Sequence, residues 1–146
     1  MQLSSYVKII PLTTVAQGAA GTTTITGPII DTQGFASGLF IVPVGTVTAG
    51  AVTSIRLEHG SVANLSDAAI VAYTGQTIAD TQSNAVLYID IRQFMRRYVR
   101  LIVSRATQNS SFGATTCLLY EAFTTPTVHA VGVTGEVHTS AGSGPA

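Results

Sequence analysis

The stretch Arg97-Tyr-Val-Arg-Leu-Ile-Val-Ser-Arg-Ala106 alternates apolar and polar side chains with a period of two. On an extended chain, successive side chains point to opposite sides, so Val99, Leu101 and Val103 share one face. The same period recurs in Val52–His59. Alternation of this kind is typical of a β-strand with one buried face.

Short segments rich in Val, Ile, Thr and Tyr recur along the whole chain, separated by Gly, Asn, Asp and Ser. Eight strands at this spacing, without helices between them, predict an all-β, single-domain antiparallel β-sandwich with extended terminal arms. About eight strands suit a jelly roll. The best helix signal is weak and lies in Asp90–Arg97, where Asp90 could cap one short turn. The expected strands are Tyr6–Leu12, Thr22–Ile30, Gly38–Val44, Val52–His59, Ala68–Thr74, Ala85–Ile91, Arg97–Ala106 and Ala114–Ala122.

One expected strand is apolar on both faces. Leu39-Phe-Ile-Val-Pro-Val44 has no polar side chain on either face, which is expected of a strand covered on both sides. Pro43 has no backbone N–H to donate to a neighbouring strand. We therefore expect this strand to lie at a sheet edge or to carry a bulge at Pro43.

The 146 residues suffice for one domain and leave no room for a second. We expect residues 1–123 to form the sandwich and residues 124–146 to form a C-terminal arm, because this last part is rich in Gly, Thr and Ser. The arm is either a frayed tail or a segment that orders on a neighbouring molecule. In the second case, its contact residues would be the spaced apolar side chains of Val128, Val131, Val133 and Val137.

Charged residues make up only 10% of the chain, against about 25% in a typical soluble domain. Part of the surface is therefore expected to be covered by Thr, Ser, Gln and Asn, and part to be buried against partner molecules. The formal net charge of zero argues against nucleic-acid and membrane partners. The N-terminus lacks a signal-peptide pattern and no apolar run reaches about 18 residues, so we expect folding in a cytoplasm.

The residues offer no catalytic or metal-binding pattern. Cys117 with His129 is a nucleophile and base pair by residue type alone, but Cys117 lies in an apolar strand pattern. Glu136 and His138 are two apart and give a weak metal signal. We therefore expect no enzyme activity, no catalytic residues, no metal and no cofactor.

The one concentrated feature is basic, because five of the six arginines and two aromatic residues fall between positions 92 and 105. Three interpretations stay open. The arginines could pair with carboxylates across strands, make a protein–protein contact, or bind nucleic-acid phosphates. The interface interpretation names Arg92, Arg96, Arg97 and Arg100 as contact residues. The near absence of lysine fits that interpretation, because Arg is favoured at protein interfaces.

Three stretches share a pattern with a known protein family, namely Ile30–Val42, Leu57–Gly60 and Arg96–Val103. The pattern consists of an aspartate-bearing turn before an apolar strand, a Thr/Ala/Gly turn leading to a strand with a polar end, and a later Arg-Tyr-Val-Arg strand. Over residues 20–122 the chain thereby resembles a group of small virion proteins of tailed bacteriophages, the capsid decoration (cement) proteins.

This resemblance implies a β-sandwich of jelly-roll type on the outer surface of an icosahedral capsid. The implied partners are the major capsid protein and further copies of the chain, as a dimer or trimer. The implied location is the virion, after assembly in the host cytoplasm. If so, we expect the termini and the loops at one end to make the coat contacts. The alternatives are a head–tail joining or tail subunit, and a non-catalytic sandwich that binds another molecule such as a carbohydrate.

Overall fold

The computed structural model describes residues 2–12 and 20–137, and this part of the chain is all-β apart from one 3₁₀ turn, η1 (Leu3–Ser5). No helix in it is long and apolar enough to cross a membrane. The strands are β1 (Lys8–Pro11), β2 (Ile25–Thr26), β3 (Ile30–Asp31), β4 (Phe35–Val47), β5 (Val52–Gly60), β6 (Ala69–Ile70), β7 (Gln76–Ile78), β8 (Val86–Ile91), β9 (Tyr98–Ala106), β10 (Ser110–Phe112) and β11 (Thr116–Ala122).

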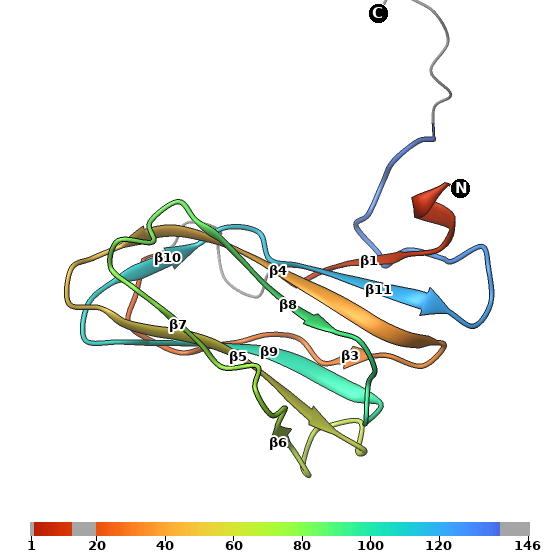
Figure 1. The fold of residues 1–146 in the computed structure, drawn as a ribbon, viewed down its shortest axis with the longest axis horizontal. Helices are drawn as coiled ribbons and strands as arrows, with labels where there is room; N and C mark the ends of the chain where they lie inside the picture. The colour runs from red at the N-terminus through yellow and green to blue at the C-terminus, as the bar shows by residue number, and fades with distance from the viewer. Residues whose placement is uncertain (1, 13–19, 138–146) are drawn as a thin grey trace, which may run out of the picture.

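Two antiparallel sheets pack face to face (Figure 1). In the first sheet, β4 lies between β8 on one side and β10 and β11 on the other, and β1 lies beyond β11. In the second sheet, β9 lies between β5 and the pair β2 and β3, and β6 and β7 lie on the far side of β5. A β-sandwich is therefore confirmed.

At three places in the sheets, two strands that follow each other in the sequence pair one after the other with the same neighbouring strand. β2 and β3 both pair with β9, β6 and β7 both pair with β5, and β10 and β11 both pair with β4. When each pair is counted as one interrupted strand and these merged strands are numbered along the chain, their spatial order is 1-8-3-6 in the first sheet and 2-7-4-5 in the second. This interleaved order is that of a jelly roll.

Two residues explain why the expected strand Thr22–Ile30 is interrupted. Gly27 donates its N–H to the Leu101 carbonyl at 2.8 Å, and a Cβ at Gly27 would lie 2.8 Å from that same oxygen. Pro28 follows and cannot donate a hydrogen bond to β9. The chain therefore leaves the ladder after Thr26 and rejoins it at Ile30.

The expectation of an edge position for the strand containing Pro43 is wrong, because β4 has neighbours on both sides. Pro43 is tolerated there because it faces the break between β10 and β11, where only the Gly113 N–H reaches the Pro43 carbonyl. The register shifts beside it, because the pairs Ser110–Val47 and Phe112–Val44 are two residues apart on β10 and three apart on β4. The extra residue is therefore in β4 itself, just after Pro43, as in the bulge expected as the alternative to an edge position.

The expected helical turn at Asp90–Arg97 is also wrong. Asp90 lies inside β8, and its carboxylate accepts a hydrogen bond from the Tyr120 hydroxyl at 2.6 Å. The remaining differences are strands that the sequence pattern did not predict, namely β7 and β10. Both are only three residues long, too short to show an alternation.

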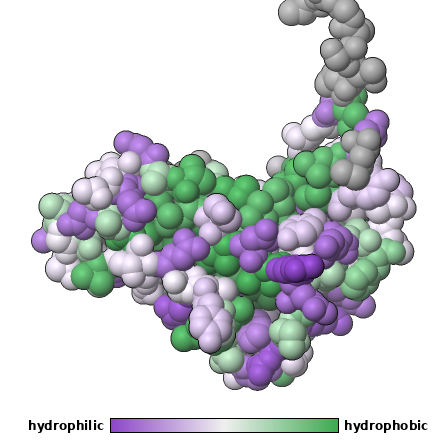
Figure 2. Space-filling model, viewed as in Figure 1, coloured by the Kyte–Doolittle hydropathy of each residue, from purple (hydrophilic) through white to green (hydrophobic). Residues whose placement is uncertain are grey.

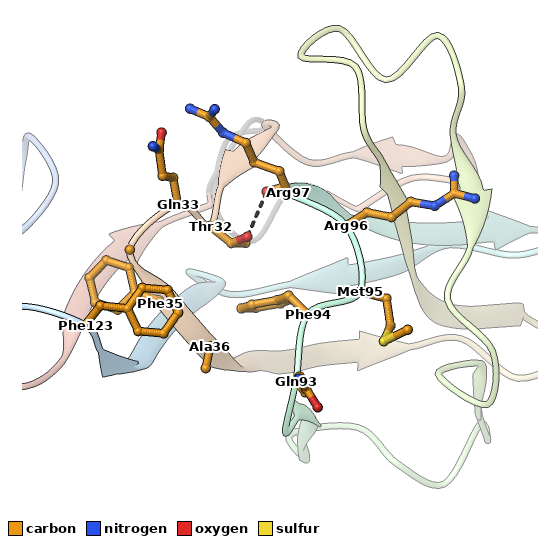
Figure 3. A pocket seen from close by; sticks show the side chains of 11 residues that line it. Thr32, Gln33, Phe35, Ala36, Gln93, Phe94, Met95, Arg96, Arg97 and Phe123 are labelled. Carbon is orange, nitrogen blue, oxygen red and sulfur yellow. Dashed lines mark hydrogen bonds between the residues drawn. The ribbon is translucent and has the colours of Figure 1, made fainter.

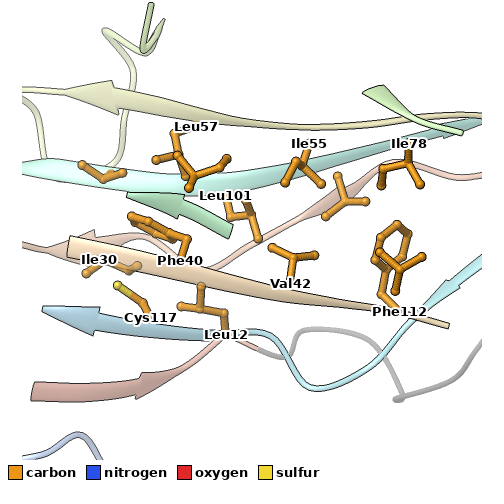
Figure 4. Close-up of a cluster of buried hydrophobic side chains, with 14 of the residues drawn as sticks. Leu12, Ile30, Phe40, Val42, Ile55, Leu57, Ile78, Leu101, Phe112 and Cys117 are labelled. Atoms are coloured by element: carbon orange, nitrogen blue, oxygen red, sulfur yellow. The ribbon is translucent and has the colours of Figure 1, made fainter. Parts of the chain in front are cut away.

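The core lies between the two sheets and is built from alternate residues of the long strands (Figure 4). Phe40 and Val42 of β4 face Ile55 and Leu57 of β5 across it, and Cys117 of β11 is fully buried in the same cluster. Burial of this apolar surface is the main force that holds the sheets together.

We expect the Cys117 thiol to be unreactive in the folded protein. Its exposed fraction is 0%, and burial raises the pKa of the thiol to about 12, so almost no thiolate is present at neutral pH. Labelling with Ellman's reagent at pH 8 should show essentially no reaction until denaturant is added. Rapid labelling of the native protein would contradict this packing.

Candidate functional site

The outer face of the first sheet is apolar. Cross-strand pairing places Ile9, Leu118 and Leu39 in one row across β1, β11 and β4, pointing away from the core, and this row ends at Asp90 of β8. A second row runs from Pro11 through Thr116 and Ile41 to Tyr88 of β8, which is 64% exposed. Figure 2 shows this apolar surface over β4 and β8. We call it the apolar face; its residues are Ile9, Pro11, Leu39, Ile41, Pro43, Val86, Tyr88 and Leu118.

The outer face of the second sheet is charged and internally paired. Glu58 of β5 accepts hydrogen bonds from Arg100 of β9 at 2.9 Å and from Arg56 at 3.2 Å. Asp31 holds Arg97 through two hydrogen bonds of 2.8 and 2.7 Å, and the Arg97 guanidinium lies 5.2 Å from the centre of the Tyr98 ring. We call this surface the ion-paired face.

Both carboxylates of the ion-paired face are held in their charged form. The hydrogen bond from Arg97 lowers the pKa of Asp31, although burial opposes it. Burial raises the pKa of Glu58, but the hydrogen bonds from Arg100 and Arg56 outweigh it and bring the pKa below its ordinary value of 4.5. The charges on this face are therefore satisfied within the chain.

Stability is expected to fall in acid through these two groups. A carboxylate with a lowered folded-state pKa stabilises the fold above its ordinary pKa, and this contribution disappears as the pH falls through the folded-state value. The melting temperature should therefore drop below about pH 4, and Glu58→Gln should drop less steeply over the same range. Parallel pH profiles for the two proteins would contradict the assignment.

One end of the sandwich gathers several loops and both described terminal segments. The turn before β4, the β5–β6 and β8–β9 connections, and the chain leaving β11 all lie there, beside the N-terminal segment (Figure 1). We call this the loop end. It holds an open pocket of about 410 Å³ (Figure 3), lined by Thr32, Gln33, Gly34, Phe35, Ala36, Gln93, Phe94, Met95, Arg96, Arg97 and Phe123.

The loop-end pocket is formed by the β8–β9 connection folding against β4. Phe94 donates its N–H to the Ala36 carbonyl at 2.8 Å, and its ring packs over Gly38, where a Cβ would lie 2.6 Å from the ring. Met95 and Phe123 stay 81% and 73% exposed at the rim. Sequence reasoning missed these apolar rim residues, because single exposed side chains in loops leave no periodic pattern.

The structure separates the arginines that the sequence groups together. Arg97 and Arg100 are paired with carboxylates on the ion-paired face. Arg96 lies at the loop end and contacts Asp67 at 3.8 Å. Arg92 is exposed at the same end and forms no ion pair with any described residue. Their role in an interface stays a prediction.

Arg105 differs from the other arginines because it is only 6% exposed. Its guanidinium donates to the Thr23 carbonyl at 2.7 Å and to the Ser110 carbonyl at 2.9 Å. A Cβ at Gly21 would lie 3.0 Å from this guanidinium, so glycine leaves room for it. Arg105 therefore joins the chain before β2 to β10 and is structural.

The first part of the C-terminal arm lies along the free edge of β1. Thr127 donates its N–H to the Ser5 carbonyl, and Ala130 donates to the Ile9 carbonyl. These contacts use the backbone, and they leave Val128 81% and Val131 99% exposed. Val137 is 54% exposed and Val133 is half-buried, so the predicted contact residues remain accessible.

The residues considered for chemistry lie in unsuitable places. Cys117 faces the core, and His129 accepts a hydrogen bond from the Ile9 N–H at 3.3 Å on the edge of β1. In the described ranges, no three His, Cys, Asp or Glu side chains come together as a metal site would need. The Glu136–His138 pair falls partly beyond these ranges, because the description ends at residue 137.

No protein-family model matches this chain, and no curated protein matches it. Among solved structures, a chain in the structure of infectious bursal disease virus Gt strain is similar over 78% of this chain, with a TM-score of 0.47 and 8% sequence identity. This chain spans 32% of that viral chain. A likeness at this distance carries no argument about function.

Proposed function

We propose that this chain is a structural virion protein that binds the outer surface of an icosahedral phage capsid and stabilises contacts between major capsid protein subunits. The observation that carries the proposal is the loop end, where exposed apolar side chains and arginines meet on a stiff sandwich. The resemblance of residues 20–122 to decoration proteins supports it independently. The protein acts in this account by contact and not by catalysis.

The contact chemistry at the loop end suits a coat surface with both acidic and apolar groups. Arg92 has no ion-pair partner among the described residues. Arg96 lies 3.8 Å from the Asp67 carboxylate and donates a hydrogen bond to the Asp67 carbonyl at 3.3 Å. Met95 and Phe123 supply exposed apolar surface beside them. Arginine forks bind carboxylates in two-point contacts, and aromatic and Met side chains are enriched at interface centres.

The mechanical role depends on the surface area buried across each seam between coat subunits and on the number of times this contact is repeated over the capsid. A filled shell pushes outward on the contacts between coat subunits, and a molecule bound across a seam adds buried surface that must be broken before the seam opens. A standard interface buries about 1,600 Å² in total, and the same contact repeats at every equivalent seam. The extended arm beside β1 can reach a second subunit and add avidity.

The test is binding of the purified protein to undecorated capsids. The Arg92→Ala, Arg96→Ala double variant should lose at least about tenfold in occupancy, since it removes the charged contacts at the seam. Gln108→Ala, at an exposed position near the opposite end, is the control and should bind normally. Full occupancy and unchanged heat resistance of capsids carrying the double variant would refute the assignment of the loop end.

A further inference from the structure

The described part of the chain leaves the apolar face uncovered. Within residues 2–12 and 20–137 the sandwich has two layers, and no third layer covers the first sheet (Figure 1). Val86 is 63% exposed and Tyr88 64% exposed. An apolar patch spread over four adjacent strands is unusual on a free monomer and marks an interaction site.

We propose that a second copy of this chain covers the apolar face, so that two molecules pair sheet to sheet about a two-fold axis. This inference goes beyond the proposed function, because it assigns a self-association surface that is separate from the loop end.

Geometry favours two-fold pairing over a larger ring. A flat face is covered completely only by another flat face, and when both belong to the same protein, the contact is isologous and closes at two copies. A trimer would need two different complementary surfaces on each copy. The opposite flat face is unsuitable as such a complement, because burying Glu58 and its arginine partners against apolar side chains would desolvate their charges.

Charge also favours a second copy. The Pro11–Tyr88 row and the Pro43–Val86 pair of the apolar face contain no charged side chain, and Asp90 lies opposite Leu39 in the row at the loop end of the face. Its ionisable groups lie at the loop end of the face, where Asp90 is bonded to Tyr120 and Glu121 to Ser37. Two copies can therefore bring their centres together without like-charge repulsion.

The size of the face predicts a reversible dimer. Four strands spaced about 4.8 Å apart, each contributing about six residues at 3.3 Å, give a footprint of roughly 20 by 20 Å. This falls below the about 800 Å² per partner of a standard interface. We therefore expect dissociation in the micromolar range, which is measurable by dilution.

The experiment compares two valines at equivalent sites on opposite faces. Val86 begins β8 on the apolar face and is 63% exposed, and Val52 begins β5 on the ion-paired face and is 61% exposed. Sedimentation equilibrium of the full chain over a concentration series should give a dimer for the wild type. Val86→Asp should raise the Kd at least tenfold, and Val52→Asp should leave it unchanged.

Ile41→Asp, at the centre of the face, should raise the Kd by at least about a hundredfold because each copy would bury an unpaired charge. Val86 is exposed in a single copy, so Val86→Asp keeps the test valid even if Ile41→Asp does not fold. A wild-type protein that stays monomeric, that forms trimers, or whose dimer ignores Val86→Asp would overturn the proposal. Capsid binding by a monomeric Val86→Asp protein would leave the proposed function intact.

Discussion

Phe40→Ala is expected to lower the free energy of unfolding by about 3–5 kcal/mol. The Phe40 ring is 0% exposed and lies at the centre of the core between the two sheets, where strands cannot close the space that it leaves. A domain of this size has about 5–15 kcal/mol of stability, so the loss would be a large fraction of the total. Urea denaturation followed by circular dichroism measures it.

Phe123→Ala is the matched control for the core variant. It deletes the same ring from a position that is 73% exposed, and it should change the unfolding free energy by less than about 0.5 kcal/mol. Equal losses in the two variants would contradict the position of the core.

Arg105→Ala is expected to lower the free energy of unfolding by about 2–4 kcal/mol, in contrast to the other arginines, since each buried carbonyl left without a partner costs about 1–3 kcal/mol. The change removes a buried guanidinium and leaves the Thr23 and Ser110 carbonyls without its two hydrogen bonds. Arg105→Lys should recover only part of the loss, since one ammonium lacks the fork that reaches both oxygens. Arg92→Ala, at an exposed site, should be nearly neutral. A neutral Arg105→Ala would show that these contacts contribute nothing.

The long strands could be predicted from sequence because their periodicity is directly tied to burial. In Arg97–Ala106, the residues expected on one face, Val99, Leu101 and Val103, are those that lie in the core. Eight expected strands correspond to the eight positions of the jelly roll, even though three positions are interrupted. The interruption of Thr22–Ile30 could be anticipated only from Pro28, because the close approach of Gly27 to the Leu101 carbonyl depends on the neighbouring strand and is not visible in a single sequence.

The candidate sites were predictable only in part. The apolar run Leu39–Val44 indicated a strand covered on both sides, and in the structure one side packs in the core while the other forms the apolar face. The cluster of arginines in sequence did not indicate which would pair, because Asp31 and Glu58 approach Arg97 and Arg100 only through the pairing of β3 and β5 with β9.

Thiol labelling of two introduced cysteines tests most directly whether protein covers the apolar face in the assembled molecule. The native Cys117 is buried, so Val86→Cys or Val52→Cys supplies the one reactive thiol of the described chain. At concentrations well above the Kd, Val86→Cys should react at least tenfold more slowly than Val52→Cys, and the rates should converge on dilution. Equal rates at every concentration would contradict the account.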